Sequence, residues 1–465
     1  MPIRTRLIVL TDINHGREVD DIQSLVRLLL YSNEIDIEGL IACTSCWHKK
    51  STARDLRIIH SVIATYGQIV SRLNVHAIGY PSPSYLHSIA ASGITEYGAA
   101  AGNGFNEERF TGVTGVRIIL DALTRNETRP LWFALWGGGN TLAQALWQAE
   151  TQYPEADFNH ILAKVRIHAI SDQDHAVAWI RKRHGDRIFF IGAPSSPEGG
   201  NDYKYATWPG ISADTFTHGS EDGISGGGFL GAPRDLVSRR WLLKNIRNHR
   251  PYGKKYPIHL FIMEGDTPSY LNLIPNGLSD PEHPDWGGWG GRYAFGFPKH
   301  RAGREQEKYP LWIGCADTVH GIDGRTHTSP QATIWRWREA MQNDFAARMQ
   351  WTTAATYGAA NHPPIVNLMA SGSSTLHPGD SVTLSAAHSA DPDGDELSFR
   401  WFVYPEAGTA SGCDIHIDGA FAPTATVHLD ALSQPGTLHV IVEVADNGTP
   451  RLTRYGRFIL AAHAI

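Results

Sequence analysis

Residues 1–355 alternate short apolar runs with longer stretches of helical periodicity, and this alternation restricts the fold more than any other feature. The apolar run Leu7–Leu10 ends at Thr11-Asp12, and a helical pattern with one apolar face begins at Asp20. Such alternation predicts an α/β domain with a mostly parallel sheet, flanking helices and ligands at the carboxyl ends of the strands. Further strands are predicted at Ile37–Ala42, Leu131–Leu135, Val165–Ile170, Ile188–Ile191 and Ile258–Met263, and further helices at Asp55–Tyr66 and Asn140–Gln148.

The pattern changes near Asn361. Beyond this residue the apolar runs are short and alternate with period two, as in Ser381–Ser385 and Val440–Val444, and turn motifs such as Asp391–Asp395 separate them. About 100 residues of this kind predict an all-β sandwich, with Trp401 in its core. We therefore expect two domains, at residues 1–360 and 361–465.

Composition and the distribution of charge argue against two kinds of partner, nucleic acid and membrane. The 465 residues carry a formal net charge of −6 without a long run of one sign, which argues against a nucleic-acid surface. No stretch approaches the roughly 20 apolar residues that span a bilayer, so no membrane partner is expected. Leu7–Leu10 is too short for the apolar region of a signal peptide and is better explained as a buried strand.

Three carboxylates are predicted around the first strand-to-helix turn, at Asp12, Asp20 and Asp21. They would repel one another unless positive charge lies among them. A helix N-terminus supplies part of that charge, and a bound Ca²⁺ would supply the rest, because hard cations prefer carboxylate and carbonyl oxygens. The structural alternative is that Asp20 caps the helix and Asp21 is an ordinary first-turn acid.

Two later turns add oxygen atoms at the same predicted edge of the sheet. The segment Trp136–Ala143 follows a strand, contains glycines that let the backbone approach a ligand, and begins a helix at Asn140, which could instead be only an N-cap. Met263–Ser269 places Glu264 and Asp266 after another predicted strand. Three such junctions on one edge together predict a metal site.

Asp172 and Asp174 follow the predicted strand Val165–Ile170 and could bind sugar hydroxyls, although Asp174 could instead cap the next helix. Several other residues could donate a proton to a leaving group or simply be ordinary polar residues: His15, Glu18, His48, His175 and Glu264.

Two long loops are expected at 199–233 and 276–293, and loops of this length in compact domains are often functional. In the second loop, Trp286 and Trp289 could stack on a sugar face or could wedge the loop by packing. Cys43 and Cys46 have the spacing of a redox or zinc pair, but no second pair of ligands closes a zinc site nearby.

Several motifs together resemble a known family. They are Thr11-Asp12 with Asp20-Asp21, the turn Gly138–Ala143 and Met263–Ser269, together with Leu28–Glu34, Ser171–Asp174 and Gly287–Tyr293. The chain is similar to the nucleoside hydrolase-like proteins of the cellulose-binding type, which carry a C-terminal immunoglobulin-like domain. It resembles the inosine–uridine nucleoside hydrolases more distantly.

The more distant resemblance implies roles for individual residues. It assigns Ca²⁺ ligands to Asp12, Asp21, the main-chain carbonyl of Asn140 and Asp266. Asp20 would bind sugar hydroxyls, and Asp12 would also be the general base that deprotonates a metal-bound water. The chain departs from the pattern in having seven residues between Asp12 and Asp20, the turn Cys43–His48 where an Asn should reach the sugar, and Gly265 where some members have a histidine.

Two functions follow as hypotheses. The first is a calcium-dependent hydrolase that cleaves the glycosidic bond of an N-ribosyl compound or a carbohydrate glycoside, small or oligomeric, through an oxocarbenium-like transition state. The second is a non-catalytic protein that binds plant polysaccharide. The resemblance favours a secreted or periplasmic location, and exposed edge strands of the sandwich would allow pairing into a homo-oligomer.

Overall fold

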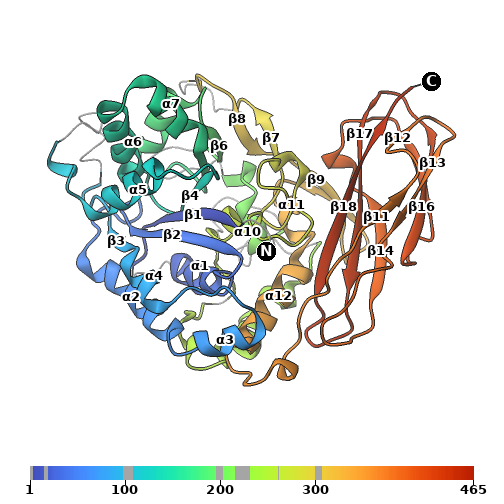
Figure 1. Cartoon of the computed structure of the whole chain (residues 1–465), viewed down its shortest axis with the longest axis horizontal. Coiled ribbons are helices and arrows are strands. Elements are labelled where there is room, and N and C mark those ends of the chain that lie inside the picture. Colours follow the sequence, from blue (N-terminus) through green and yellow to red (C-terminus); the bar gives the residue numbers. More distant parts are fainter. Residues whose placement is uncertain are drawn as a thin grey trace.

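The computed structural model describes residues 4–14, 19–97, 108–194, 203–214, 231–259, 261–298 and 306–464. The described chain forms a large α/β domain followed by a β-sandwich, which lies against one side of the first domain (Figure 1). Within the described residues, no helix is both long and apolar enough to span a membrane.

The large domain is built on an eight-stranded sheet of order β3-β2-β1-β4-β5-β6-β8-β7. All neighbouring strands pair in parallel except β7 and β8, which are antiparallel. The expected α/β class is confirmed, and β1 lies near the middle, between β2 and β4. The strands are β1 (Thr5–Thr11), β2 (Ile35–Ala42), β3 (Ala90–Ser92), β4 (Leu131–Leu135), β5 (Val165–Ala169), β6 (Phe189–Gly192), β7 (Tyr293–Gly296) and β8 (Leu311–Gly314).

Helices cover both faces of this sheet (Figure 1). Alternate residues of β1 point to opposite sides, so that Leu7 and Val9 pack with residues of α1, α2 and α12, whereas Ile8 and Leu10 pack with residues of α5, α6 and α8. The helices are α1 (Asp20–Leu29), α2 (Ala53–Tyr66), α3 (Val70–His76), α4 (Pro83–Ser88), α5 (Thr114–Thr124), α6 (Asn140–Gln152), α7 (Glu155–Lys164), α8 (His175–His184), α9 (Arg239–Leu242), α10 (Pro268–Leu271), α11 (Ala332–Trp335) and α12 (Arg338–Trp351).

The predicted strand Ile258–Met263 is wrong. Within its described residues the segment forms only an isolated bridge, between Phe261 and Ser238. The side chain of Gln23 in α1 satisfies the backbone instead, since its amide donates to the carbonyl of Pro257 at 3.0 Å and accepts from the N–H of Met263 at 2.8 Å. A single glutamine therefore replaces a neighbouring strand as the hydrogen-bond partner.

The C-terminal part contains two four-stranded sheets, of order β11-β13-β16-β15 and β12-β18-β17-β14. They enclose a separate apolar core that includes Trp401, as expected. The last 3₁₀ turn before the sandwich is Tyr357–Ala359, and the predicted boundary at residue 360 stays a prediction. The strands are β11 (Met369–Ser371), β12 (Thr375–Leu376), β13 (Ser381–Ser385), β14 (Ser398–Val403), β15 (Asp414–Asp418), β16 (Thr424–Ala431), β17 (Gly436–Ala445) and β18 (Thr453–Ala462). A two-stranded ribbon of β9 (Asp317–His320) and β10 (Thr326–Ser329) lies between the large sheet and the sandwich (Figure 1).

Two buried carboxylates hold the sandwich to the large domain. Asp317 accepts from the hydroxyl of Tyr404 at 2.6 Å and pairs with Arg292 at 2.7 Å. Asp344 pairs with Arg454 of β18 at 2.7 Å and with Arg348 at 3.0 Å. Burial alone would raise the pKa of Asp344, but the two guanidinium groups lower it to about 2.

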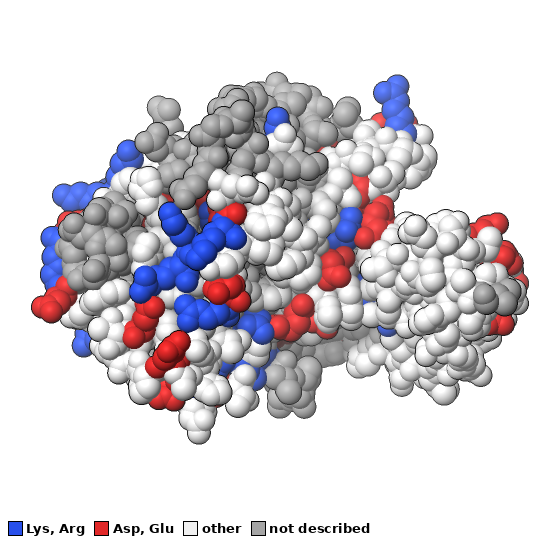
Figure 2. Space-filling model, turned by 90° about the horizontal axis from the view of Figure 1, so that it is seen from above, with Lys and Arg blue, Asp and Glu red and all other residues white. Residues whose placement is uncertain are grey.

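Acidic and basic side chains are interspersed on the face that Figure 2 shows.

Candidate metal centre

Three carboxylates from distant parts of the sequence converge beside the end of β1. Oxygen atoms of Asp20, Asp21 and Asp266 all lie within 4.8 Å of one another. Asp20 and Asp21 begin α1, and Asp266 comes just before α10. Asp21 and Asp266 are only 5 % and 3 % exposed, so their charges are held largely away from solvent. The structure therefore brings Asp21 and Asp266 together although the predicted strand before Asp266 does not form.

Contacts between α1 and the segment before α10 fix this arrangement. The hydroxyl of Thr11, the last residue of β1, donates to the carboxylate of Asp21. Thr267, next to Asp266, donates through its hydroxyl to Ser24 in α1 at 3.0 Å. Ser269 donates to the main-chain carbonyl of Asp266 at 2.6 Å. Pro268 is the first residue of α10, which is the position expected for it.

Asp12 lies in the adjoining turn, outside the group of three. It is 4 % exposed and accepts a hydrogen bond from the hydroxyl of Ser45. The backbone of Gly137 also lies close to Asp12. A Cβ at Gly137 would come within 2.9 Å of the Asp12 Cβ and 3.0 Å of its Oδ1. A glycine is thus required where the β4–α6 turn approaches Asp12.

Asn140 forms hydrogen bonds through its side chain and its main-chain N–H. Its side-chain amide donates to Thr44 at 3.3 Å, and its N–H donates to Asp174 at 3.0 Å. Because Asn140 is the first residue of α6 and the carbonyl of Gly139 already accepts from Ala143, the Asn140 carbonyl is directed along the helix. The assignment of this carbonyl as a metal ligand stays a prediction.

Two residues of this region were not anticipated. Gln173 donates from its side chain to the carbonyl of Trp136 at 2.6 Å and accepts from the N–H of Cys46 at 2.7 Å, so it ties three turns together. His168 of β5 contacts the hydroxyl of Tyr293 at 3.1 Å, and burial lowers its pKa to about 3, which keeps the imidazole neutral. The only sequence indication for either was its place at the end of a buried strand.

Asp174 and Asp172 both have structural partners. Asp174 is the N-cap of α8, as the alternative interpretation expected, and accepts from the N–H groups of Ala176 and Val177. Burial raises its pKa to about 6 despite these hydrogen bonds. Asp172 forms a buried, two-pronged ion pair with Arg181 at 2.6 and 2.7 Å. Both carboxylates are thus engaged within the protein, and the substrate-binding role expected for them stays a prediction.

Glu264 and His48 are similarly engaged. Glu264 is fully buried, pairs with Arg27 at 2.9 Å and accepts from the hydroxyl of Tyr256 at 2.7 Å. Its expected contact with substrate stays a prediction. His48 is half-buried, and its Nε2 lies 3.0 Å from Asp55. Among the other candidates, His175 is exposed at the start of α8, and His15 and Glu18 lie outside the described residues.

Trp286 and Trp289 form the contact with the sandwich. Trp289 is fully buried, and its indole N–H donates to the hydroxyl of Tyr455 at 3.3 Å, so it presents no face to a sugar. The Trp286 ring stacks on His283 at 4.1 Å between centroids and meets His439 of β17 edge-on. These contacts favour the packing alternative for both tryptophans, and their stacking on a sugar stays a prediction.

The buried thiol of Cys43 reports the electrostatics of the centre. Its pKa is raised well above the usual value, first by burial and then by the negative charges of Asp12, Asp174 and Asp21. All four cysteines are free thiols, so Cys43 and Cys46 form no disulfide. The carboxylate charges near Cys43 would favour a cation, and the available ligand atoms are the hard oxygens that Ca²⁺ and Mg²⁺ prefer.

Comparison with known proteins agrees with the architecture. Residues 6–293 match the family described as cellulose-binding Sde182, nucleoside hydrolase-like domain. Residues 381–462 match the family described as cellulose-binding protein Sde0182, C-terminal domain. Among solved structures, the chain is similar to a nucleoside hydrolase-related hypothetical protein from Saccharophagus degradans that is associated with carbohydrate metabolism, with a TM-score of 0.76 and 29% sequence identity over 99% of this chain and 100% of that one. A search of curated proteins finds no match.

Proposed function

The chain belongs to the cellulose-binding Sde182 family with a nucleoside hydrolase-like domain, and we propose that this domain is a calcium-dependent hydrolase of glycosidic bonds. The substrate class would be carbohydrate glycosides or N-ribosyl compounds. The observation that supports the proposal is the convergence of Asp20, Asp21 and Asp266 within 4.8 Å at the edge of the sheet. Keeping carboxylates so close with little solvent is costly unless a cation joins them.

Asp21 and Asp266, from the group of three, would hold the ion together with Asp12 from the adjoining turn, which the resemblance assigns as a ligand. When bound, calcium would neutralise these carboxylates, orient sugar hydroxyls and lower the pKa of a coordinated water, although much less than zinc does. The main-chain carbonyl of Asn140 would complete the ligand set, as the resemblance implies.

Asp12 would accept a proton from the attacking water. The hydroxyl of Ser45 donates to its carboxylate, which supports a fixed orientation for this group. Asp20 is more exposed than Asp21 and would bind sugar hydroxyls. In the reaction, water adds to the anomeric carbon, its proton passes to Asp12, and the leaving group departs with a proton from an acid.

One observation favours a second candidate, a binding protein without catalysis. Glu264, a candidate for the acid, is fully buried, and its carboxylate is engaged by Arg27 and by the hydroxyl of Tyr256. Asp172 is likewise paired with Arg181. A cleft that keeps its cation and sugar contacts but lacks this acid would bind polysaccharide and leave it intact.

Calorimetry with CaCl₂ on the full chain tests the cation site. We expect one Ca²⁺ per chain, with binding abolished in Asp21→Asn and Asp266→Asn and kept in Asp157→Asn, an exposed acid in α7. Unchanged calcium affinity in either of the first two variants would refute the ligand assignment.

Two further assays separate the candidates. Sugar release from cello-oligosaccharides or nucleosides that is lost in Asp12→Asn would support the hydrolase. Sedimentation with cellulose, without release and unaffected by Asp12→Asn, would support the binding protein and overturn the first proposal.

A further inference from the structure

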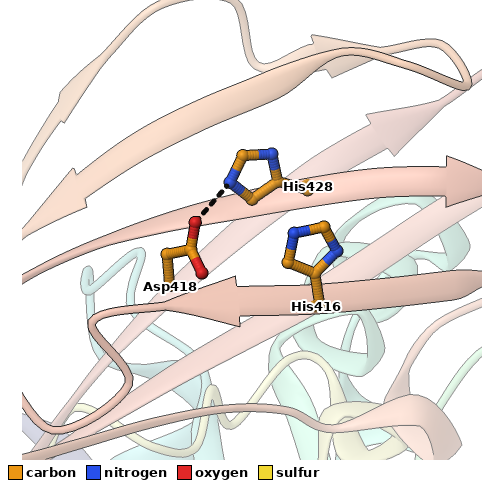
Figure 3. A group of neighbouring side chains, drawn as sticks. All are labelled: His416, Asp418 and His428. Atoms are coloured by element: carbon orange, nitrogen blue, oxygen red, sulfur yellow. Dashed lines mark ion pairs between the residues drawn. The ribbon is translucent and has the colours of Figure 1, made fainter.

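A second group of potential metal ligands lies far from the acidic centre, on the outer face of the sandwich. His416 and Asp418 come from β15 and His428 from β16, and one ligand atom of each lies within 4.8 Å of the other two. Figure 3 shows the two imidazole rings side by side on neighbouring strands, with Asp418 directed toward His428.

The strand register produces this group. β15 and β16 are antiparallel, and His416 is directly opposite His428. Along β16, Ala425, Val427 and Leu429 are buried in the sandwich core, so the alternate residues face outward. The solvent face of the strand pair therefore carries both histidines, with Asp418 and Asp430 each two residues away.

The carboxylates are placed as partners of the imidazoles. Asp430 Oδ2 lies 2.5 Å from Nδ1 of His416, and Asp418 Oδ2 lies 3.2 Å from Nε2 of His428. The two rings are parallel within 5° and 4.3 Å apart between centroids. The Asp430 carboxylate on Nδ1 of His416 fixes the tautomer of that ring and makes its Nε2 a better metal ligand.

The environment of His428 is an independent indication. Its Nε2 is shielded from solvent and forms no hydrogen bond with any described residue, although Oδ2 of Asp418 lies 3.2 Å away. A shielded ring nitrogen without a hydrogen bond is unusual. A cation between His428 and Asp418 would satisfy it.

We propose that His416, His428 and Asp418 bind one borderline divalent transition-metal ion, Zn²⁺ in the first instance, on the sandwich. Imidazole nitrogens with one carboxylate are a ligand set that suits Zn²⁺, whereas Ca²⁺ prefers oxygen ligands alone. Asp430 is a positioning residue that acts through His416. Because β15 is the edge strand of its sheet, the ion would link that edge to its inner neighbour.

Titration of the full, tag-free chain with ZnCl₂ tests the site. The Asp266→Asn background removes a ligand from the acidic centre, so failure here is distinct from failure of the calcium proposal. We expect one Zn²⁺ per chain, a higher melting temperature with Zn²⁺, at least tenfold weaker binding in His416→Ala and in His428→Ala, and no site in the double variant.

Matched variants sharpen the result. Asp430→Asn should weaken binding about 10- to 100-fold without removing a ligand. His388→Ala, which removes an exposed histidine of the same domain, should leave binding unchanged. An absence of Zn²⁺ binding by the starting chain, or wild-type affinity in the double variant, would overturn the proposal. Circular dichroism spectra that match among the variants would show that the sandwich remains folded.

Discussion

The acidic turns of the large domain and the tryptophan–glycine loop 276–293 look equally functional in the sequence, yet the structure uses them differently. The turns bring Asp20, Asp21 and Asp266 to one point. The loop brings Trp289 and Gly277 against Tyr455 of the sandwich. Packing explains buried tryptophans and glycines completely, whereas packing cannot explain carboxylates gathered in a poorly solvated place. Variants of the loop should therefore change stability, and variants of the turns should change ligand binding.

Replacing Trp289 should have the largest effect on stability. Trp289→Ala removes a fully buried ring from the domain contact and should cost about 3–5 kcal/mol of unfolding free energy. Urea unfolding measures this cost, and calorimetry should show unchanged calcium affinity. A loss of calcium binding in a variant that is still folded would contradict the assignment of stability to the loop and of ligand binding to the turns.

The cap at Asp174 should make stability depend on pH. Its pKa of about 6 lies above the ordinary value near 3.9, so the folded state binds the additional proton. This contribution, on the order of 2–3 kcal/mol, is complete below about pH 4 and is lost as the pH rises through 6. In Asp174→Asn, which keeps an N-cap, unfolding free energies of the calcium-free protein between pH 4 and 7 should lack this decline. An identical decline in the variant would assign it to another group.

Gly277 tests how closely the two domains approach. It has a φ of +87°, and a Cβ there would come within 2.0 Å of the carbonyl of Tyr455. Gly277→Ala should therefore cost roughly 2 kcal/mol, from left-handed strain together with displacement of β18. Gly358→Ala, where no atom lies within 4 Å of the added Cβ, provides the control. Equal melting temperatures for the two variants would argue against a tight domain contact.

Removing one charge from the acidic turns should have the smallest effect on stability. Unlike the substitutions of Trp289 and Gly277, it should stabilise the protein. Asp266→Asn relieves repulsion with Asp20 and Asp21, so the calcium-free protein should become more stable by on the order of 1 kcal/mol. Added calcium should then no longer raise its melting temperature. Destabilisation of the calcium-free protein by this substitution would show that the carboxylates are held by other groups and not by a cation.

Local patterns predicted the fold well. The strand β4 was predicted with the observed bounds, and β1 and α6 to within a few residues, because each depends on apolar periodicity within its own segment. The strand Ile258–Met263 was wrong because Gln23, far away in the sequence, satisfies that backbone. The resemblance to the cellulose-binding, nucleoside hydrolase-like proteins is confirmed by the family match.

The candidate site was predicted less completely, for the same reason. Asp21 and Asp266 lie together as predicted, but the strand expected before Asp266 does not form. The partners Arg27 and Arg181, which neutralise Glu264 and Asp172, could not be identified from the sequence. Which acids stay available to a ligand depends on long-range pairs, and no local motif encodes them.

The paired carboxylates at the domain junction have a mechanical consequence. To swing the sandwich away, the protein would have to uncover Asp317 and Asp344 and separate them from Tyr404 and Arg454, at a cost of several kcal/mol for the buried pair alone. The two folds should therefore tumble as one rigid unit. A long polymer lying across both of them would contact two surfaces that are held at a constant spacing and angle.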